Sequence, residues 1–583
     1  MAPVRLLRQM TGTVPVWIAT LACASAASAG AATLLPAAIG RGVDVALAFS
    51  AGRTGSASLW TWAAACGALV AVIACGDAFI QLGTGTTTGN CAGWLRHELL
   101  RHILACGPRV TSRFEVGDAV NRLVGGTVGA AAAPSGAVLA LTATIPAFGS
   151  VIALGLIDPW LAVAFLAGMP AVAFALRKFM RDTSDVVLRY QQAQGEITAR
   201  LVGAMSGART IAAAGTCDQE IARVLNPLPR LRAHGHRTWR VLGRITAQSG
   251  LLVPALQVLV LAVGGIELTR HRITPGELLA ASQYAALGAG IGAAIGQLNQ
   301  LARARSGAAR VAELFDVAPP EKGYAPLPEE GRGRMEFRGV TVRANDQTVV
   351  EDLNLIIPAG SEVAVVGVSG AGKSTLAALA GRLTDPTEGA VFLDGVPLRW
   401  LASRDLRAAL SYAFERPALL GRTVRDTIGF GIERSADDLS VNGRIVGAAR
   451  AARAEKFIRR LPQRYLTPLD RSPLSGGEVQ RLGLARALAH AEKARVLVFD
   501  DATSSLDTVT EMEVSRALSE QYGDRTKIIV THRVATAASA DMVAWLEAGR
   551  LRALARHEEL WQDPEYRAVF GGGGAAQAGN GTG

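Results

Sequence analysis

The chain has 583 residues and a mean hydropathy of +0.25; 50% of its residues are hydrophobic and only 19% are charged. This composition excludes a disordered chain, which needs low hydrophobicity and high charge, and it disfavours a wholly soluble protein, whose core could not bury so much apolar surface. The net charge of +11 would suit nucleic acid. The cationic residues are placed as in a membrane protein, however, so we expect no nucleic-acid partner.

Six apolar runs precede residue 305, and most are long enough to cross a bilayer as helices, which takes about 20 residues. The fourth run is the shortest, and a tight turn at Asp158 and Pro159 separates it from the third. Arg5 and Arg8 precede the first run as in a secretory signal, but the run is too long and five more follow, which disfavours a removed signal. The predicted spans are 13–38, 58–82, 135–157, 159–176, 248–268 and 276–300.

Cationic side chains concentrate in two of the segments between these runs. Segment 83–134 contains five arginines and segment 177–245 contains twelve cationic residues, whereas the opposite loops contain two arginines each. Because positive residues favour the cytoplasmic side, we expect a multi-pass protein of the bacterial cytoplasmic membrane with both termini in the cytoplasm.

Both basic segments continue the helical pattern of the run before them, as 94–104 and 190–211 illustrate. Helices that extend beyond the bilayer would carry short connectors into the cytoplasm, one near 112–118 and one near 210–221. Ordinary cytoplasmic helical loops are the alternative.

Asp77 lies late in the second apolar run. An ionisable residue inside a membrane segment is a functional candidate. A hydrated position near the cytoplasmic interface explains it equally well.

Composition changes after Phe315 into a stretch rich in proline, glycine and charge, which is typical of an extended tether. We therefore assign 1–316 to a membrane domain, 317–333 to a linker and 334–570 to a soluble domain of alternating strands and helices. The glycine-rich tail 571–583 is expected to be disordered.

The soluble domain contains the sequence GVSGAGKST after an apolar strand and before an apolar helix, the context that a P-loop requires. Its glycines let backbone N–H groups point at phosphate oxygens, and the helix N-terminus adds positive potential. Lys373 supplies a charge for the outer phosphates and Ser374 a hydroxyl for Mg²⁺. The nucleotide-binding candidates are Gly367, Ser369, Gly370, Ala371, Gly372, Lys373, Ser374 and Thr375.

A second apolar strand ends at Asp500, whose carboxylate is placed to bind Mg²⁺ together with Ser374. Between the two strands, the sequence LSGGE begins another helix and forms a second anion cradle. One chain does not need two phosphate cradles for one nucleotide, so the second cradle is expected to serve a nucleotide bound by another chain. Its candidate residues are Ser475, Gly476, Gly477 and Glu478.

Together these motifs resemble the ATP-binding cassette (ABC) superfamily, specifically exporter-fold (type IV) half-transporters such as subunits of actinobacterial natural-product exporters. The resemblance also includes SSLD, which ends at the D-loop Asp507, and THR, which contains the switch histidine His532. It implies an all-α six-helix transmembrane domain followed by an α/β P-loop domain. It further implies that two cassettes meet head to tail, with each ATP between one P-loop and the partner's signature, and that the two connectors are coupling helices.

The chain departs from the family pattern around its own P-loop. Asp501 stands where the family has a glutamate that orients the attacking water; one methylene less withdraws the carboxylate by about 1–1.5 Å, and such misplacement costs roughly a hundredfold in rate. Glu415 replaces the Q-loop glutamine and is the third candidate ligand for Mg²⁺, after Ser374 and Asp500. Ala344 replaces the aromatic residue that stacks on adenine. Segment 465–473 lacks the usual glutamate-containing coupling stretch, whereas the signature departs only at Glu478.

We therefore expect an ATP-driven exporter subunit that moves a small molecule or modified peptide. The departures favour a heterodimer in which this chain's own site, with Lys373, Asp501, His532 and Glu415 as catalytic candidates, hydrolyses ATP poorly. A homodimer with two slow sites, an importer of a siderophore-like ligand and a regulatory subunit are the alternatives. Only the basic pI supports a cassette ATPase acting on nucleic acid.

Overall fold

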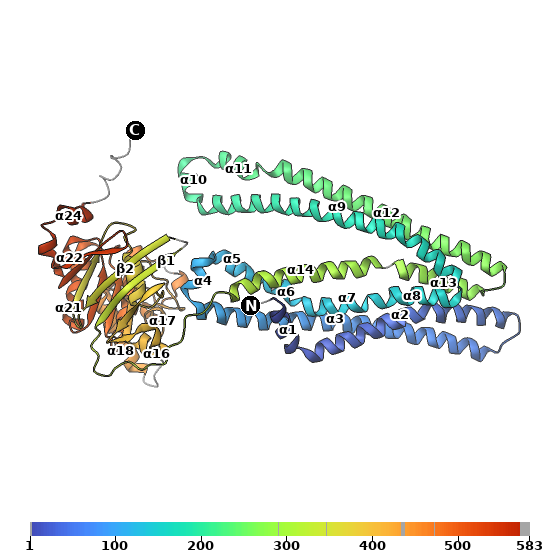
Figure 1. Ribbon diagram of the computed structural model, residues 1–583, viewed down its shortest axis with the longest axis horizontal. Helices are drawn as coiled ribbons and strands as arrows, with labels where there is room; N and C mark the ends of the chain where they lie inside the picture. The colour runs from blue at the N-terminus through green and yellow to red at the C-terminus, as the bar shows by residue number, and fades with distance from the viewer. Residues whose placement is uncertain (1–2, 290, 345–346, 433–437, 472, 572–583) are drawn as a thin grey trace. The chain divides into compact units, whose positions relative to one another are not determined.

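The computed structural model describes residues 3–289, 291–344, 347–432, 438–471 and 473–571. By its internal contacts the chain divides into two units, Met1–Leu104 with Phe114–Val317, and Ala105–Arg113 with Ala318–Gly583. The described part of the first unit is helical, and the second contains two β-sheets (Figure 1). The predicted tail 571–583 lies outside the described residues except for Gly571.

Most of the predicted membrane runs lie on helices that continue beyond them, because the length of an apolar run reflects bilayer thickness whereas a helix also accommodates polar residues. The first, second, fourth and fifth runs lie on α2 (Pro15–Ser50), α3 (Ser56–Cys106), α9 (Pro159–Ser206) and α12 (Leu228–Thr269). The third ends a series formed by α5 (Val116–Asn121), η1 (Arg122–Gly126), α6 (Thr127–Ala131), α7 (Ala133–Thr142) and α8 (Thr144–Ile157). The sixth is shared by α13 (Pro275–Ala289) and α14 (Ile291–Phe315).

Among the described residues, four stretches are long and apolar enough to cross a membrane: Pro15–Ser50, Ser56–Cys106, Val116–Ile157 and Leu251–Thr269. The fourth run is represented by the shorter apolar stretch Pro159–Ala171. Large apolar side chains on these helices are exposed, including Trp60 at 71% and Leu156 at 83%. Such an outer surface suits contact with lipid rather than water.

Short helices occur at both predicted connectors. Helices α10 (Ala208–Ala214) and α11 (Cys217–Leu225) overlap the predicted segment 210–221 and join the ends of the paired helices α9 and α12 (Figure 1). Helix α4 (Pro108–Arg113) begins earlier than the predicted 112–118, whose second half instead enters α5. The shift has a local cause: Gly107 has φ +58°, a conformation that ends a helix, and proline at 108 favours a new first turn.

Helix α1 (Pro3–Thr13) was not predicted. It is amphipathic, and Leu6 and Met10 on its apolar face are buried against the helical unit.

The second unit contains a four-stranded sheet of order β2-β1-β4-β5 and a six-stranded sheet of order β10-β9-β3-β8-β7-β6. In the larger sheet β9, β3, β8, β7 and β6 are parallel, so their carboxyl ends meet at one edge. The strands are β1 (Met335–Ala344), β2 (Gln347–Ile357), β3 (Glu362–Val366), β4 (Glu388–Leu393), β5 (Val396–Pro397), β6 (Leu410–Ala413), β7 (Val496–Asp500), β8 (Thr526–Val530), β9 (Met542–Glu547) and β10 (Arg550–Ala555).

Helices cover this sheet, and two of them begin at the predicted phosphate cradles. These are α15 (Lys373–Ala380) and α20 (Gly476–His490). Strands β3 and β7 are almost fully buried, which fixes the loops that follow them. The second unit also contains α16 (Ser403–Ala409), α17 (Val424–Ile428), α18 (Asp438–Ala451), α19 (Glu455–Ile458), α21 (Thr508–Tyr522), α22 (Val534–Ser539), α23 (His557–Leu560) and α24 (Pro564–Phe570), of which α17 and α18 pack on α20.

Candidate functional site: a nucleotide site at the edge of the parallel sheet

The predicted P-loop connects the end of β3 directly to the first residue of α15. Gly370 and Gly372 have φ values of +83° and +92°, which L side chains rarely adopt. A Cβ at Gly367 would lie 2.3 Å from the carbonyl oxygen of Leu546. Close approach of the loop to the sheet therefore requires glycine at 367, whereas the positive φ values favour glycine at 370 and 372. A backbone of this kind can curl around phosphate.

Lys373 lies along this loop. Its Nζ donates hydrogen bonds to the carbonyl oxygens of Gly367 at 2.8 Å and Val368 at 3.0 Å. Burial lowers the pKa of Lys373, and the negative charges of Asp501 and Asp500 oppose that shift. Asp501 and Asp500 are thus close enough to Lys373 for their charges to act on it.

Asp500, the last residue of β7, fits a Mg²⁺ site. Its Oδ2 accepts a hydrogen bond from the Tyr412 hydroxyl at 3.1 Å, while its Oδ1 is buried and has no hydrogen-bond partner among the described residues. Burial raises the pKa of Asp500, hydrogen bonds from Ser374 and Tyr412 lower it, and the charges of Asp501 and Glu415 raise it. A buried carboxylate oxygen without a partner, next to a serine hydroxyl, is a donor set that a hard cation prefers.

The described residues contain no cluster of three or more His, Cys, Asp or Glu side chains able to bind a metal. Mg²⁺ bound with a nucleotide needs few protein ligands, because phosphates and water complete its shell. Glu415, the third predicted ligand, has a side chain 51% exposed that pairs with Arg416 at 3.6 Å. It acts on Asp500 through its charge, which raises the pKa of that carboxyl.

Asp501 and His532, two of the four predicted catalytic residues, lie close together just after the ends of β7 and β8. The Oδ1 atom of Asp501 lies 3.1 Å from Nδ1 of His532. Asp501 has φ +48°, a left-handed conformation that aspartate tolerates better than most residues. Its backbone N–H donates to the carbonyl oxygen of Val530 at 3.3 Å.

The signature residues form the N-terminus of α20. Ser475 is the N-cap, and Glu478 closes a capping box by accepting hydrogen bonds from the Ser475 N–H at 2.8 Å and from its hydroxyl at 2.9 Å. Gly476 and Gly477 form the first turn. Glu478 therefore holds the serine hydroxyl that the sequence assigns to the nucleotide.

Asp507 caps α21. Its carboxylate accepts hydrogen bonds from the Thr510 N–H at 2.9 Å and the Thr510 hydroxyl at 2.7 Å, and these bonds lower the pKa of Asp507. The predicted D-loop aspartate thus has a structural role in ordering its own loop.

Both halves of the chain match known families. The family model for the ABC transporter transmembrane region matches residues 18–289, and the model described as ABC transporter matches residues 350–504. The ABC transporter ATP-binding protein RamA of Streptomyces coelicolor is 44% identical over 579 residues, covering 98% of this chain and 88% of RamA. The chain is an ABC transporter.

Other relatives agree with an export function. The multidrug efflux ATP-binding/permease protein Rv0194 of Mycobacterium tuberculosis is 34% identical over 425 residues, which cover 70% of this chain and 35% of that protein. The structure of a bacterial Atm1-family ABC exporter with ATP bound superposes with a TM-score of 0.76 at 25% identity, covering 96% of this chain and 98% of that one. The transporter is therefore an ABC exporter half-transporter that binds ATP and couples its hydrolysis to transport, as predicted.

In the transporter's helical unit, Asp77 on α3 accepts a hydrogen bond from the Ser28 hydroxyl on α2 at 2.9 Å. Gly76 makes this approach possible, because a Cβ there would lie 2.8 Å from Cβ of Ser28. Asp77 thus has at least a packing role in the α2–α3 pair.

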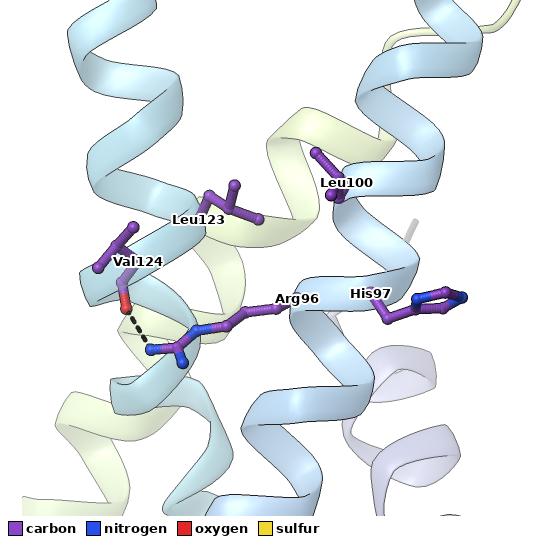
Figure 2. A pocket seen from close by; sticks show the side chains of 5 residues that line it. All are labelled: Arg96, His97, Leu100, Leu123 and Val124. Atoms are coloured by element: carbon purple, nitrogen blue, oxygen red, sulfur yellow. Dashed lines mark hydrogen bonds between the residues drawn. The ribbon is translucent and has the colours of Figure 1, made fainter. Parts of the chain in front are cut away.

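A shallow, mostly apolar hollow of about 380 Å³ lies farther along α3 and is lined by Arg96, His97, Leu100, Leu123 and Val124. Figure 2 shows Arg96 reaching from α3 to the carbonyl oxygen of Val124, at 3.1 Å. Val124 lies in the π-helical turn η1, and its carbonyl oxygen also accepts a hydrogen bond from the Thr127 hydroxyl at 3.3 Å. Arg96, which lines the hollow, thus joins α3 to this turn.

Two site residues were missed at the level of sequence. Tyr412 on β6 donates to Asp500, and Gln480 on α20 contacts several of the nucleotide-site loops. A glutamine on the buried face of a helix that also buries Leu482 and Leu484 was a signal that could have identified the second.

Proposed function

We propose that the chain is one half of a heterodimeric exporter whose own P-loop site binds ATP but hydrolyses it poorly. One observation supports this proposal most directly: the residue paired with the switch histidine His532 is Asp501, whose carboxylate is one methylene shorter than glutamate. A shorter reach leaves the attacking water poorly oriented, which costs roughly a hundredfold in rate. The intact serine and glycines of the signature would complete a more active site on the partner subunit.

Each ATP would lie between one subunit's P-loop and the other's signature. Lys373 and the loop N–H groups would bind the phosphates, and Ser374 with Asp500 would hold Mg²⁺, which neutralises charge on the phosphates. Asp501 and His532 would face the terminal phosphate. Closure of the two cassettes would then shift the helices from inward- to outward-facing.

We further propose that the transporter lies in the bacterial cytoplasmic membrane with both termini in the cytoplasm and exports a small molecule or modified peptide, such as a natural product. The distribution of arginines supports the orientation. Relatives of the chain include multidrug efflux proteins and lipid A-core flippases, and this similarity supports export of such a molecule.

The test is the ATPase activity of the purified chain alone, before and after Asp501→Glu. We expect slow turnover by the wild type and a rise of roughly tenfold to a hundredfold in the variant, because glutamate restores the missing reach. His532→Ala should abolish the gain and serves as the control for contaminating ATPase. Robust turnover by the wild-type chain alone would contradict the heterodimer and favour a homodimer.

Transport direction and partnership need separate measurements. ATP-dependent uptake into inverted vesicles is expected for an exporter, whereas uptake by right-side-out cells would favour import of a siderophore-like ligand. If flux survives Lys373→Ala in this chain but stops with the equivalent change in its partner, the chain is a regulatory subunit.

A further inference from the structure

Gln480 is 2% exposed and forms hydrogen bonds with three separate segments around the nucleotide site. Its Nε2 lies 3.1 Å from the carbonyl oxygen of Glu415, 3.2 Å from that of Asp501 and 2.9 Å from the Ser504 hydroxyl. Its Oε1 accepts from the Ser505 N–H at 2.8 Å. One amide thus joins the helix that begins at the signature to the Q-loop, the residue after β7 and the D-loop.

These contacts matter most for Asp501, whose backbone is in the left-handed region. Such a conformation persists only where the surroundings fix it. The N–H of Asp501 is bonded to Val530 on β8, and its carbonyl oxygen is bonded by Gln480. The two bonds hold both ends of the residue, so they set the direction in which its carboxylate points toward His532.

The D-loop depends on the same amide. Gln480 binds consecutive residues, Ser504 through the hydroxyl and Ser505 through the N–H. The carbonyl oxygen of Ser505 also lies close to the signature, since a Cβ at Gly477 would be 3.1 Å from it. A shift of α20 would therefore move the D-loop and the backbone of Asp501 together.

We propose that Gln480 is a positioning residue that aims Asp501 and couples the signature helix to this chain's own P-loop site. The short aspartate side chain makes the coupling strict, because it has one torsion fewer than glutamate with which to correct an error in its backbone. The signature contacts the nucleotide bound by the partner subunit. Its movement is thereby transmitted to Asp501, which acts on the nucleotide bound by this chain's own P-loop.

The experiment measures single-turnover ATP hydrolysis, which resolves slow rates, by the assembled full-length transporter. Gln480→Met keeps the side-chain length and removes every hydrogen bond, whereas Gln480→Glu keeps an acceptor for Ser505 and loses the donors. We expect both to lower the rate by roughly tenfold to a hundredfold, with the ATP concentration for half-maximal rate changed less than about twofold. Gln521→Met, which alters an exposed glutamine on α21, should leave the rate unchanged.

A second comparison separates positioning from general damage to the fold. In an Asp501→Glu background the longer side chain can correct its aim, so the penalty of Gln480→Met should shrink at least about threefold. Equal penalties in both backgrounds, an unchanged rate, or a loss of ATP binding together with thermal stability would each overturn the proposal. Fast turnover by the wild-type chain alone would argue against the heterodimer and leave this inference intact.

Discussion

At the residue scale, the nucleotide site contains polar groups that are costly to bury and whose interactions are complete only when a ligand is bound. Asp500 is the clearest case, since one carboxylate oxygen accepts from Tyr412 and the other has no partner in the described part of the chain. Burial of that oxygen destabilises the ionised form, which Mg²⁺ would in turn favour. The strand end is thus kept for function at the expense of stability.

We predict that Asp500→Asn stabilises the nucleotide-free protein and abolishes hydrolysis. Because the folded-state pKa of Asp500 is raised above its unfolded value, the folded state binds the proton more tightly. Its contribution to stability is therefore present at low pH and is lost as the pH rises through the raised pKa. The variant should raise the melting temperature at pH 7 by roughly 2–4 °C, and this difference should disappear on acidification. Asp501→Asn is the matched control, and an equal gain from it would contradict the explanation.

At the scale of elements, the side chain of Asp44 joins α2 to the first turn of α13. Asp44 on α2 accepts from the Gly276 N–H at 2.8 Å and from the Thr274 hydroxyl at 2.6 Å, and so caps α13 from another helix. A Cβ at Gly276 would lie 2.0 Å from the carbonyl oxygen of Gly40. Small residues at this contact allow close helix packing in a membrane.

We therefore predict that Gly276→Ala destabilises the helical unit by about 1–3 kcal/mol, as overpacked sites do. Unfolding temperatures in detergent would measure the effect. Gly265→Ala on α12 is the matched control, because nothing lies within 4 Å of a Cβ there. Equal stability of the two variants would contradict the close contact.

At the scale of the whole molecule, helix α4 comes from the helical half of the sequence but belongs by its contacts to the second unit. Its Arg109 donates to the carboxylate of Asp385 at 2.5 Å and to the carbonyl oxygen of Ala318 at 3.2 Å. Asp385 also pairs with Arg382, which is buried. A connector fixed to the cassette in this way can transmit motion along the chain to the membrane helices.

We predict that Arg109→Gln leaves basal ATPase activity within about twofold and lowers ATP-dependent transport several-fold, because the charge pair is lost while the nucleotide site is untouched. Flux of the transported substrate per ATP hydrolysed in proteoliposomes is the measurement. Arg113→Gln on the same helix is the comparison variant. A parallel fall in hydrolysis and transport would show that Arg109 serves the cassette itself.

The sequence by itself determined the features whose physics is local. Glycine spacing after an apolar strand identified the P-loop, a carboxylate at the end of a second strand identified Asp500 as a candidate ligand, and long apolar runs identified a helical transmembrane domain. Each of these three features depends on neighbours within a few residues or on contact with lipid. None of them requires knowledge of how the helices and strands pack.

Only the tertiary structure decided how these features act together. Asp501 has a left-handed backbone that its surroundings fix. Its contact with His532 and the hydrogen bonds of Gln480 join residues that are 21 to 65 positions apart in the chain. No periodicity encodes such contacts, because hydrogen bonds between loops arise from the packing of the sheet and helices that carry them. The same reason explains why α1 and the start of α4 were misplaced or missed, since a short helix is fixed more by its caps and contacts than by its own propensity.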